Sequence, residues 1–219
     1  MRQRGFLGLV VAAVLALLAP AVTRADLLVY ATNSSADAGG TGSFDVYVKN
    51  TTSNTTYNII SFNAELYVVG ITGLTFTGAD EFTTDYGYIF GSVQVTPLGV
   101  IPLTGDSIQL SDSAPMDINS NSIPTSLAPG VSLGLGRVKY SLAAGSPLDG
   151  NNPIPIYFTD GNIHIYDESN PSPIALEIPI GGAVTVPVPE PGTLVLAGLV
   201  SGLGGVCVYK RRRAGQAVA

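Results

Sequence analysis

Few residues in this chain of 219 could perform catalysis. There is one histidine, His164, and one cysteine, Cys207, which lies in an apolar stretch near the C-terminus. A catalytic serine triad would have to use His164, and the sequence lacks the Gly-x-Ser-x-Gly elbow that exposes a serine nucleophile. A zinc site usually needs several histidine or cysteine ligands, more than this chain contains. We therefore expect no enzyme, no metal and no cofactor.

Carboxylates are more abundant, and the chain has sixteen acidic residues. A glycosidase needs two of them across a cleft. The available candidates are Glu65, Asp80, Glu81, Asp85 and Asp167-Glu168. A calcium site needs several loop oxygens, and two groups could supply them: Asp80-Glu81 with Asp85, and Asp106, Asp112 and Asp117 with Asn119. Neither group has the EF-hand spacing, so we interpret these acids as solvated loop charges.

Tyrosines are the candidates for ligand binding, because a sugar ring can stack on an exposed aromatic ring. We expect Tyr47 and Tyr67 to share an outer sheet face with Glu65, and Tyr86 and Tyr88 to form a second platform. The chain has no tryptophan, which counts against a strong glycan site. Outward tyrosines are also common in strands for reasons of packing alone.

The charge distribution excludes a nucleic-acid partner. Sixteen acidic residues and three basic residues, Lys49, Arg137 and Lys139, lie between Asp26 and Pro191, which gives this part a net charge of −13. A surface of that sign repels phosphate backbones and anionic lipid.

The region 26–186 is predicted to be one all-β domain. Apolar residues alternate with polar ones in short runs, with Phe44, Val46 and Val48 expected to face the core and Asp45, Tyr47 and Lys49 to face solvent. The same period of two, typical of half-buried strands, recurs in 62–68 and 137–142. Many such runs between Gly-, Pro- and Asn-rich segments favour an antiparallel β-sandwich of Greek-key or jelly-roll type.

Local signals predict further elements of this sandwich. Tyr157 to Tyr166 is interpreted as a β-hairpin, because Asp160-Gly161 suits the positive φ of a type I′ turn. More strands are expected near 27–32, 86–95, 107–111 and 183–186, with polar loops at 50–57 and 112–126.

The N-terminus has the pattern of a cleaved secretory signal over residues 1–25. Arg2 and Arg4 precede an apolar stretch from Phe6 to Leu18, and small residues follow. That stretch is shorter than the roughly 20 residues of a spanning helix. We expect a signal helix that is removed after Ala25.

The C-terminus has three parts in a fixed order. A sorting motif of Pro189, Glu190, Pro191 and Gly192 precedes a transmembrane helix predicted over 193–209, which has no charged residue. A basic anchor of Lys210, Arg211, Arg212 and Arg213 follows, and 214–219 form a short cytoplasmic tail. Basic residues favour the cytoplasmic side, so the β-domain is expected outside the membrane.

This three-part order over 187–213 resembles the PEP-CTERM sorting signal of Gram-negative bacteria. The resemblance implies recognition by an exosortase, a membrane protease-transpeptidase, with cleavage near Pro189 to Gly192. It also implies export from a Gram-negative bacterium, membrane anchoring through the helix before processing, and a later place at the cell surface or in an exopolysaccharide or biofilm matrix.

The β-domain itself resembles cohesin-type and related carbohydrate-binding sandwiches. The resemblance is carried by Ser43 to Asn50, Ile60 to Leu66, Leu135 to Ser141 and the closing Gly182 to Val186. It implies a binding surface, because cohesins bind dockerin modules, but it assigns no residues to that surface.

We therefore interpret the chain as an exported, non-enzymatic surface or matrix protein sorted by its tail. The alternative is a carbohydrate- or protein-binding module with the same tail, whose partner is exopolysaccharide or another surface protein.

Overall fold

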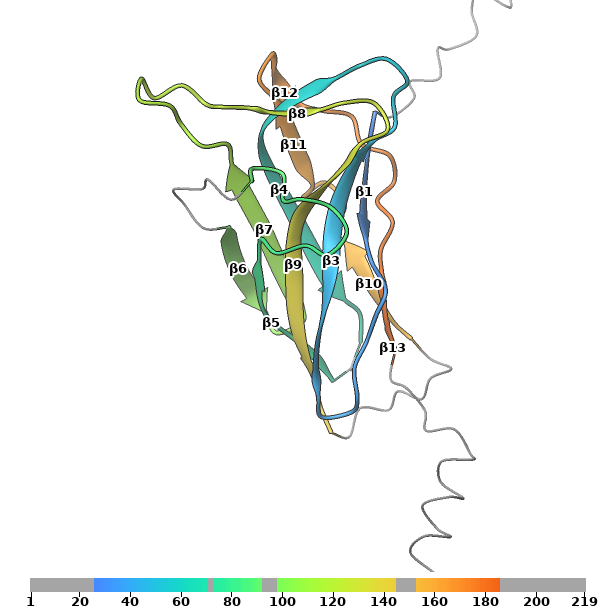
Figure 1. Ribbon diagram of the computed structural model, residues 1–219. Helices are drawn as coiled ribbons and strands as arrows, with labels where there is room; N and C mark the ends of the chain where they lie inside the picture. The colour runs from blue at the N-terminus through green and yellow to red at the C-terminus, as the bar shows by residue number, and fades with distance from the viewer. Residues whose placement is uncertain (1–25, 71–72, 92–97, 145–152, 186–219) are drawn as a thin grey trace, which may run out of the picture.

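The computed structural model describes residues 26–70, 73–91, 98–144 and 153–185, and every regular element in them is a β-strand (Figure 1). The strands are β1 (Leu27–Ala31), β2 (Ser34–Ser35), β3 (Thr41–Asn50), β4 (Tyr57–Val68), β5 (Leu74–Asp80), β6 (Gly99–Thr104), β7 (Ser107–Ser113), β8 (Thr125–Leu127), β9 (Ser132–Leu142), β10 (Ile154–Phe158), β11 (His164–Asp167), β12 (Asn170–Pro173) and β13 (Ala183–Thr185). The described part of the chain contains no helix long and apolar enough to cross a membrane.

The smaller sheet has four antiparallel strands in the order β1-β3-β9-β5. β1 and β3 lie close to the strands predicted for them, β9 begins five residues before the predicted run 137–142, and β5 was not predicted. One irregularity interrupts the β3–β9 ladder, because Val46 lies opposite Gly136 and Tyr47 opposite Gly134, which leaves Leu135 as an extra residue on β9.

The larger sheet is built around β4. One edge of β4 pairs with β7 and then β8, and the other edge pairs with β10 and β11. Strand β6 extends the sheet beyond β7, β12 extends it beyond β11, and β13 extends it beyond β10. All of these pairings are antiparallel, whereas β13 pairs in parallel with β2.

The predicted hairpin between Tyr157 and Tyr166 is wrong. β10 and β11 do not pair with each other; they follow one another along the same edge of β4, where Tyr157 pairs with Tyr67 and His164 with Asn63. Residues 159–163 are an insertion between them, closed by a turn in which the Asn162 N–H donates to the Thr159 carbonyl at 3.1 Å. Gly161 has φ of 79° while Asp160 has a negative φ, so the turn is not type I′.

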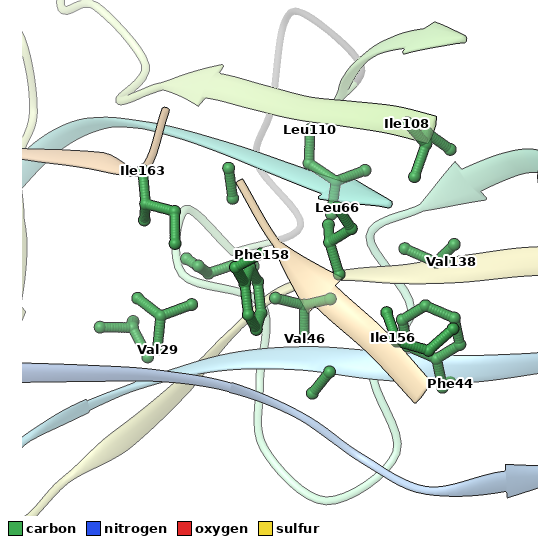
Figure 2. Packing of buried hydrophobic residues seen from close by; sticks show 14 of the residues in the cluster. Val29, Phe44, Val46, Leu66, Ile108, Leu110, Val138, Ile156, Phe158 and Ile163 are labelled. Atoms are coloured by element: carbon green, nitrogen blue, oxygen red, sulfur yellow. The ribbon is translucent and has the colours of Figure 1, made fainter. Parts of the chain in front are cut away.

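The core lies between the two sheets and is formed by their inner faces. Figure 2 shows it from close by, with Val29, Phe44, Val46 and Val138 of the smaller sheet facing Leu66, Leu110 and Ile156 of the larger one. The core positions predicted for Phe44, Val46 and Val48 are confirmed, because all three side chains are buried. This burial of apolar surface is the main favourable term in folding.

The strand predicted near 86–95 is not formed in the part described. Residues 81–91, here called the strap, leave the end of β5 as an irregular segment that crosses in front of β9 in Figure 1. The strap is fixed to β9, because the Gly134 N–H donates to the Gly87 carbonyl at 2.9 Å and the Ile89 N–H to the Gly134 carbonyl at 2.8 Å. Ile89 and Phe90 then enter the core, where Phe90 stacks on Phe62.

Candidate binding face of the larger sheet

The outer side of β4 carries a row of polar and aromatic side chains. Alternation along the strand buries Phe62, Ala64, Leu66 and Val68 and leaves Asn63, Glu65 and Tyr67 on the solvent side. The neighbouring strands extend the row, because paired residues point to the same side of a sheet. The paired residues are Gln109 of β7 beside Glu65, Tyr157 of β10 beside Tyr67, and His164 of β11 beside Asn63. We call this surface the open face.

Two tyrosines form the aromatic part of the open face. The rings of Tyr67 and Tyr157 stack with centroids 5.6 Å apart and an interplanar angle of 29°. Tyr157 is 43% exposed, so a flat aromatic surface is available to a ligand. Tyr67 was predicted as a ligand-binding residue. Its partner was missed, because the sequence does not show that β10 lies beside the end of β4.

Glu65 is held in position by the insertion between β10 and β11. Its Oε1 accepts a hydrogen bond from the Thr159 hydroxyl at 3.1 Å, and its Oε2 accepts one from Asn162 Nδ2 at 2.6 Å. Nearby, Gln109 Nε2 donates to Asn63 Oδ1 at 2.8 Å. The polar part of the open face is therefore a set of mutually oriented groups rather than freely moving side chains.

Tyr47 does not share a face with Glu65 and Tyr67, and that prediction is wrong. It lies on β3 in the smaller sheet and is fully buried, with an exposed fraction of 0%. The strap covers it: the Tyr86 ring packs edge-on at 5.1 Å, and the Asp85 N–H donates to the Tyr47 hydroxyl oxygen at 3.1 Å. Burial, which outweighs that hydrogen bond, raises the pKa of Tyr47 to about 12.

Asp45, also predicted to face solvent, is buried beneath the same strap. Its carboxylate accepts hydrogen bonds from Arg137 Nε at 2.8 Å, from the Thr84 N–H at 2.8 Å and from the Tyr47 hydroxyl at 2.9 Å. Burial alone would raise its pKa, but the bonds from Arg137, Thr84 and Tyr47 outweigh it and hold the pKa below the usual value. The outer surface of the smaller sheet is thus covered at Asp45 and Tyr47.

Tyr86 and Tyr88 both lie on the strap but do not form one platform. Tyr86 is partly exposed above Tyr47, whereas the Tyr88 hydroxyl donates to Asp112 Oδ2 at 2.5 Å. Tyr88 also lines a pocket of about 320 Å³ with Glu81, Phe82, Thr83, Gly87 and Gly91. These two tyrosines are separate from the open face, since the strap covers the other sheet.

Acids from both groups considered for calcium are used by the fold itself. Asp80 Oδ2 forms an ion pair with Lys139 Nζ at 2.6 Å, and Asp117 Oδ1 accepts the N–H groups of Asn119 and Asn121 in its own loop. Within the described ranges, no three histidine, cysteine, aspartate or glutamate side chains gather as metal ligands.

A polar pocket of about 450 Å³ lies at one end of the sandwich, between the start of β1 and the β11–β12 turn. Its lining includes Asp26, Tyr57, Asn58 and Asp167. Asp167 is engaged by the backbone there, accepting the N–H of Asn58 at 2.6 Å and that of Ser169 at 2.8 Å. We interpret this pocket as a structural junction, because its buried carboxylate joins the start of β4 to the β11–β12 turn.

The sorting residues Pro189 to Gly192, the helix predicted over 193–209 and the basic anchor Lys210 to Arg213 lie outside the described residues. So does the predicted signal, 1–25.

Comparison with solved structures places the sandwich among cohesin domains in fold. The sixth cohesin of Acetivibrio cellulolyticus scaffoldin B, solved in complex with a Cel5 dockerin, aligns with a TM-score of 0.53 and 11% identity over 74% of this chain and 99% of that one. A type I cohesin–dockerin complex of Clostridium thermocellum gives a TM-score of 0.53 and 16% identity over 76% of this chain and 99% of that one. The seventh ScaB type I cohesin of Pseudobacteroides cellulosolvens aligns with a TM-score of 0.52 and 12% identity over 75% of this chain and 94% of that one. No protein-family model and no curated protein sequence matches the chain. The chain therefore has a cohesin-like all-β sandwich fold, as its sequence predicted.

Proposed function

We propose that this chain is an exported, non-enzymatic protein whose sandwich binds another surface protein through the open face. The observation that carries the proposal is the contrast between the two sheets. The strap covers the outer side of the smaller sheet at Asp45 and Tyr47, whereas the stacked Tyr67–Tyr157 pair and Glu65 remain accessible on the larger one. Exposed tyrosines on a rigid sheet are typical of interface centres, because they bury a large area at low entropic cost.

The fold supports a protein as the ligand. Two of the similar cohesins were solved in complex with dockerins, so a sandwich of this kind is able to present a protein-binding surface. Fold alone does not establish function. The residues of the open face are identified from this chain's own structure and are not taken from the similar cohesins. The proposal therefore depends on the open face and gains support from the fold.

A second candidate function is binding to exopolysaccharide. The Tyr67–Tyr157 pair beside Glu65 and Asn162 favours it, because a pyranose can stack on a tyrosine while its hydroxyls bond to neighbouring polar groups. This candidate uses the same face, so an experiment is needed to distinguish a protein ligand from a polysaccharide ligand.

We further propose that the C-terminal tail determines where the domain is displayed. The Pro189 to Gly192 motif, the apolar stretch 193–209 and the basic anchor would be recognised by an exosortase in a Gram-negative envelope. The helix would hold the chain in the membrane until cleavage, after which the domain would remain at the cell surface or in the matrix.

Site-specific photocross-linking in the native host tests the binding face. A photoreactive phenylalanine at position 157 should capture a surface protein, and the same residue at position 49, exposed on the smaller sheet, should not. Tyr67→Ala should weaken the capture from position 157. Equal capture from both positions would contradict the proposal. Retention by purified exopolysaccharide in affinity electrophoresis, lost in Tyr157→Ala, would favour the second candidate instead.

Intact mass spectrometry of native surface and membrane fractions tests the sorting proposal. We expect loss of residues 1–25 and of everything after about residue 191, and any additional mass at the new C-terminus would identify the attachment. A protein that keeps Thr193 to Ala219 would show a plain membrane anchor, and exosortase processing would then be wrong.

A further inference from the structure

Charges are segregated between the two sheets. The basic side chains of the described residues are Lys49 on β3 and Arg137 and Lys139 on β9, all in the smaller sheet. Two of these are neutralised locally, Arg137 by Asp45 at 2.8 Å and Lys139 by Asp80 at 2.6 Å. The strands of the larger sheet therefore carry no lysine or arginine over their described residues.

The open face carries a carboxylate without a cation. Glu65 accepts hydrogen bonds from Thr159 and Asn162, which are neutral donors, and the two ion pairs of the described residues do not include it. An ionised carboxylate can accept about four hydrogen bonds, so its acceptor capacity is only partly used. Asp106, whose carbonyl accepts the Val68 N–H, and Asp160, between Thr159 and Asn162, add negative charge close to the same face.

The aromatic pair lies next to this carboxylate. Tyr67 is two residues beyond Glu65 on the same side of β4, a spacing of roughly 7 Å along a strand. The faces of aromatic rings carry negative electrostatic potential, which attracts cations. A carboxylate beside a stacked tyrosine pair thus offers two kinds of attraction to one positively charged group.

We propose that the open face receives an arginine side chain from a cationic partner protein, placed between Glu65 and the Tyr67–Tyr157 pair. This inference rests on the proposed function and names the chemistry of the partner. A guanidinium is planar, stacks on aromatic rings and donates two hydrogen bonds to a carboxylate, whereas a lysine ammonium is a compact charge that cannot do both. Charge complementarity with the acidic domain would also speed association and make it sensitive to salt.

The test is an NMR titration of the isotope-labelled full chain, kept in solution with a mild neutral detergent. The probes are the Nα-acetyl N-methylamides of arginine, lysine and citrulline, the last of which has nearly the shape of arginine without its charge. We expect the arginine probe to shift the amide signals of Glu65, Tyr67 and Tyr157 in a saturable way. The lysine probe should shift them less, and the citrulline probe should leave them unchanged.

Two variants with the same change in net charge separate a specific site from general attraction. Glu65→Gln keeps an oxygen that can accept from Asn162, and its new amide N–H can donate to the Thr159 hydroxyl oxygen, so it should fold. It should weaken arginine binding roughly three- to fivefold. Glu81→Gln, on the strap, should leave that affinity unchanged. Equal responses to arginine and citrulline, or equal losses in the two variants, would overturn the inference.

The titration also separates this inference from the proposed function. If cross-linking from position 157 captures a surface protein while the arginine probe gives no shifts, the face binds protein by other chemistry and the arginine inference is wrong. If neither experiment gives a signal, both are wrong.

Discussion

Arg137 donates hydrogen bonds to both carboxylate oxygens of Asp45, through Nε at 2.8 Å and through Nη2 at 3.3 Å. The two residues are direct register partners across β3 and β9. Arg137 Nη2 also contacts the Thr84 hydroxyl, and the Thr84 N–H donates to Asp45 at 2.8 Å. One charged pair thus joins two strands to the strap that covers them.

Removal of the Asp45 carboxylate should therefore be costly. In Asp45→Ala the Arg137 guanidinium, the Tyr47 hydroxyl and the Thr84 N–H lose their common acceptor. We expect the free energy of unfolding to fall by about 2–4 kcal/mol, because groups left without partners in a buried site carry a desolvation penalty. Urea unfolding followed by circular dichroism measures the change.

The matched control is the second ion pair of the same sheet. Asp80 pairs with Lys139 at 2.6 Å, but the Lys139 side chain is 52% exposed. Asp80→Ala should cost less than about 1 kcal/mol, as exposed pairs usually do. A loss as large as that of Asp45→Ala would show that burial beneath the strap is not what makes the first pair important.

Acid should destabilise the domain through Asp45 and Asp167. Burial raises the pKa of each carboxyl, but hydrogen bonds outweigh it and hold both pKa values below the usual one. Their stabilisation is thus complete above the unfolded pKa of about 3.9 and is lost as the pH falls through the lower folded values. We expect urea midpoints to change little between about pH 6 and pH 5 and to fall below about pH 4. Asp45→Asn should have a shallower fall, and an unchanged slope would contradict the assignment.

Local patterns were enough to predict several of the strands and part of the core. Alternation depends on neighbouring residues alone, so it placed Phe44 and Leu66 correctly in the interior. It could not place Tyr47, because the groups that cover it are the Asp85 backbone and the Tyr86 ring, far along the chain. An outward position in a strand is exposed only if nothing else covers that face.

The candidate site was predicted only in part for a similar reason. Glu65 and Tyr67 are visible from β4 itself, but Thr159 and Asn162 are 94 and 97 residues away from Glu65 in sequence. The Asp160-Gly161 signal correctly indicates a turn. Because a turn signal does not say which strands pair, it also led to the wrong hairpin.

Gly134 should be required for the strap to lie on β9. A Cβ atom at this position would be 2.7 Å from Thr83 Cγ2 and 2.9 Å from Thr83 Cβ, both closer than side chains approach. Gly134→Ala should displace the strap and lower the free energy of unfolding by about 1–3 kcal/mol. It should also speed chymotrypsin cleavage at the exposed Phe82. Gly87→Ala is the control within the strap, since a Cβ there meets nothing within 4 Å. Cleavage at the same rate in both variants would contradict the prediction.

Asn50 at the end of β3 should tolerate no charge. Its side chain is fully buried; Nδ2 donates to the carbonyls of Thr55 at 2.7 Å and Leu127 at 2.9 Å, and Oδ1 accepts the Thr52 N–H at 3.0 Å. Asn50→Asp has nearly the same shape but replaces the two donors with an oxygen that faces two carbonyls. We expect the free energy of unfolding to fall by at least about 3 kcal/mol near neutral pH. The loss should shrink in mild acid as the new carboxyl takes up a proton, because burial and the nearby carbonyls disfavour its charged form. Asn54→Asp, exposed in the adjacent loop, should change stability by less than about 0.5 kcal/mol. Equal urea midpoints for the two variants would mean that the Asn50 carboxamide does not join the β3 end to β8.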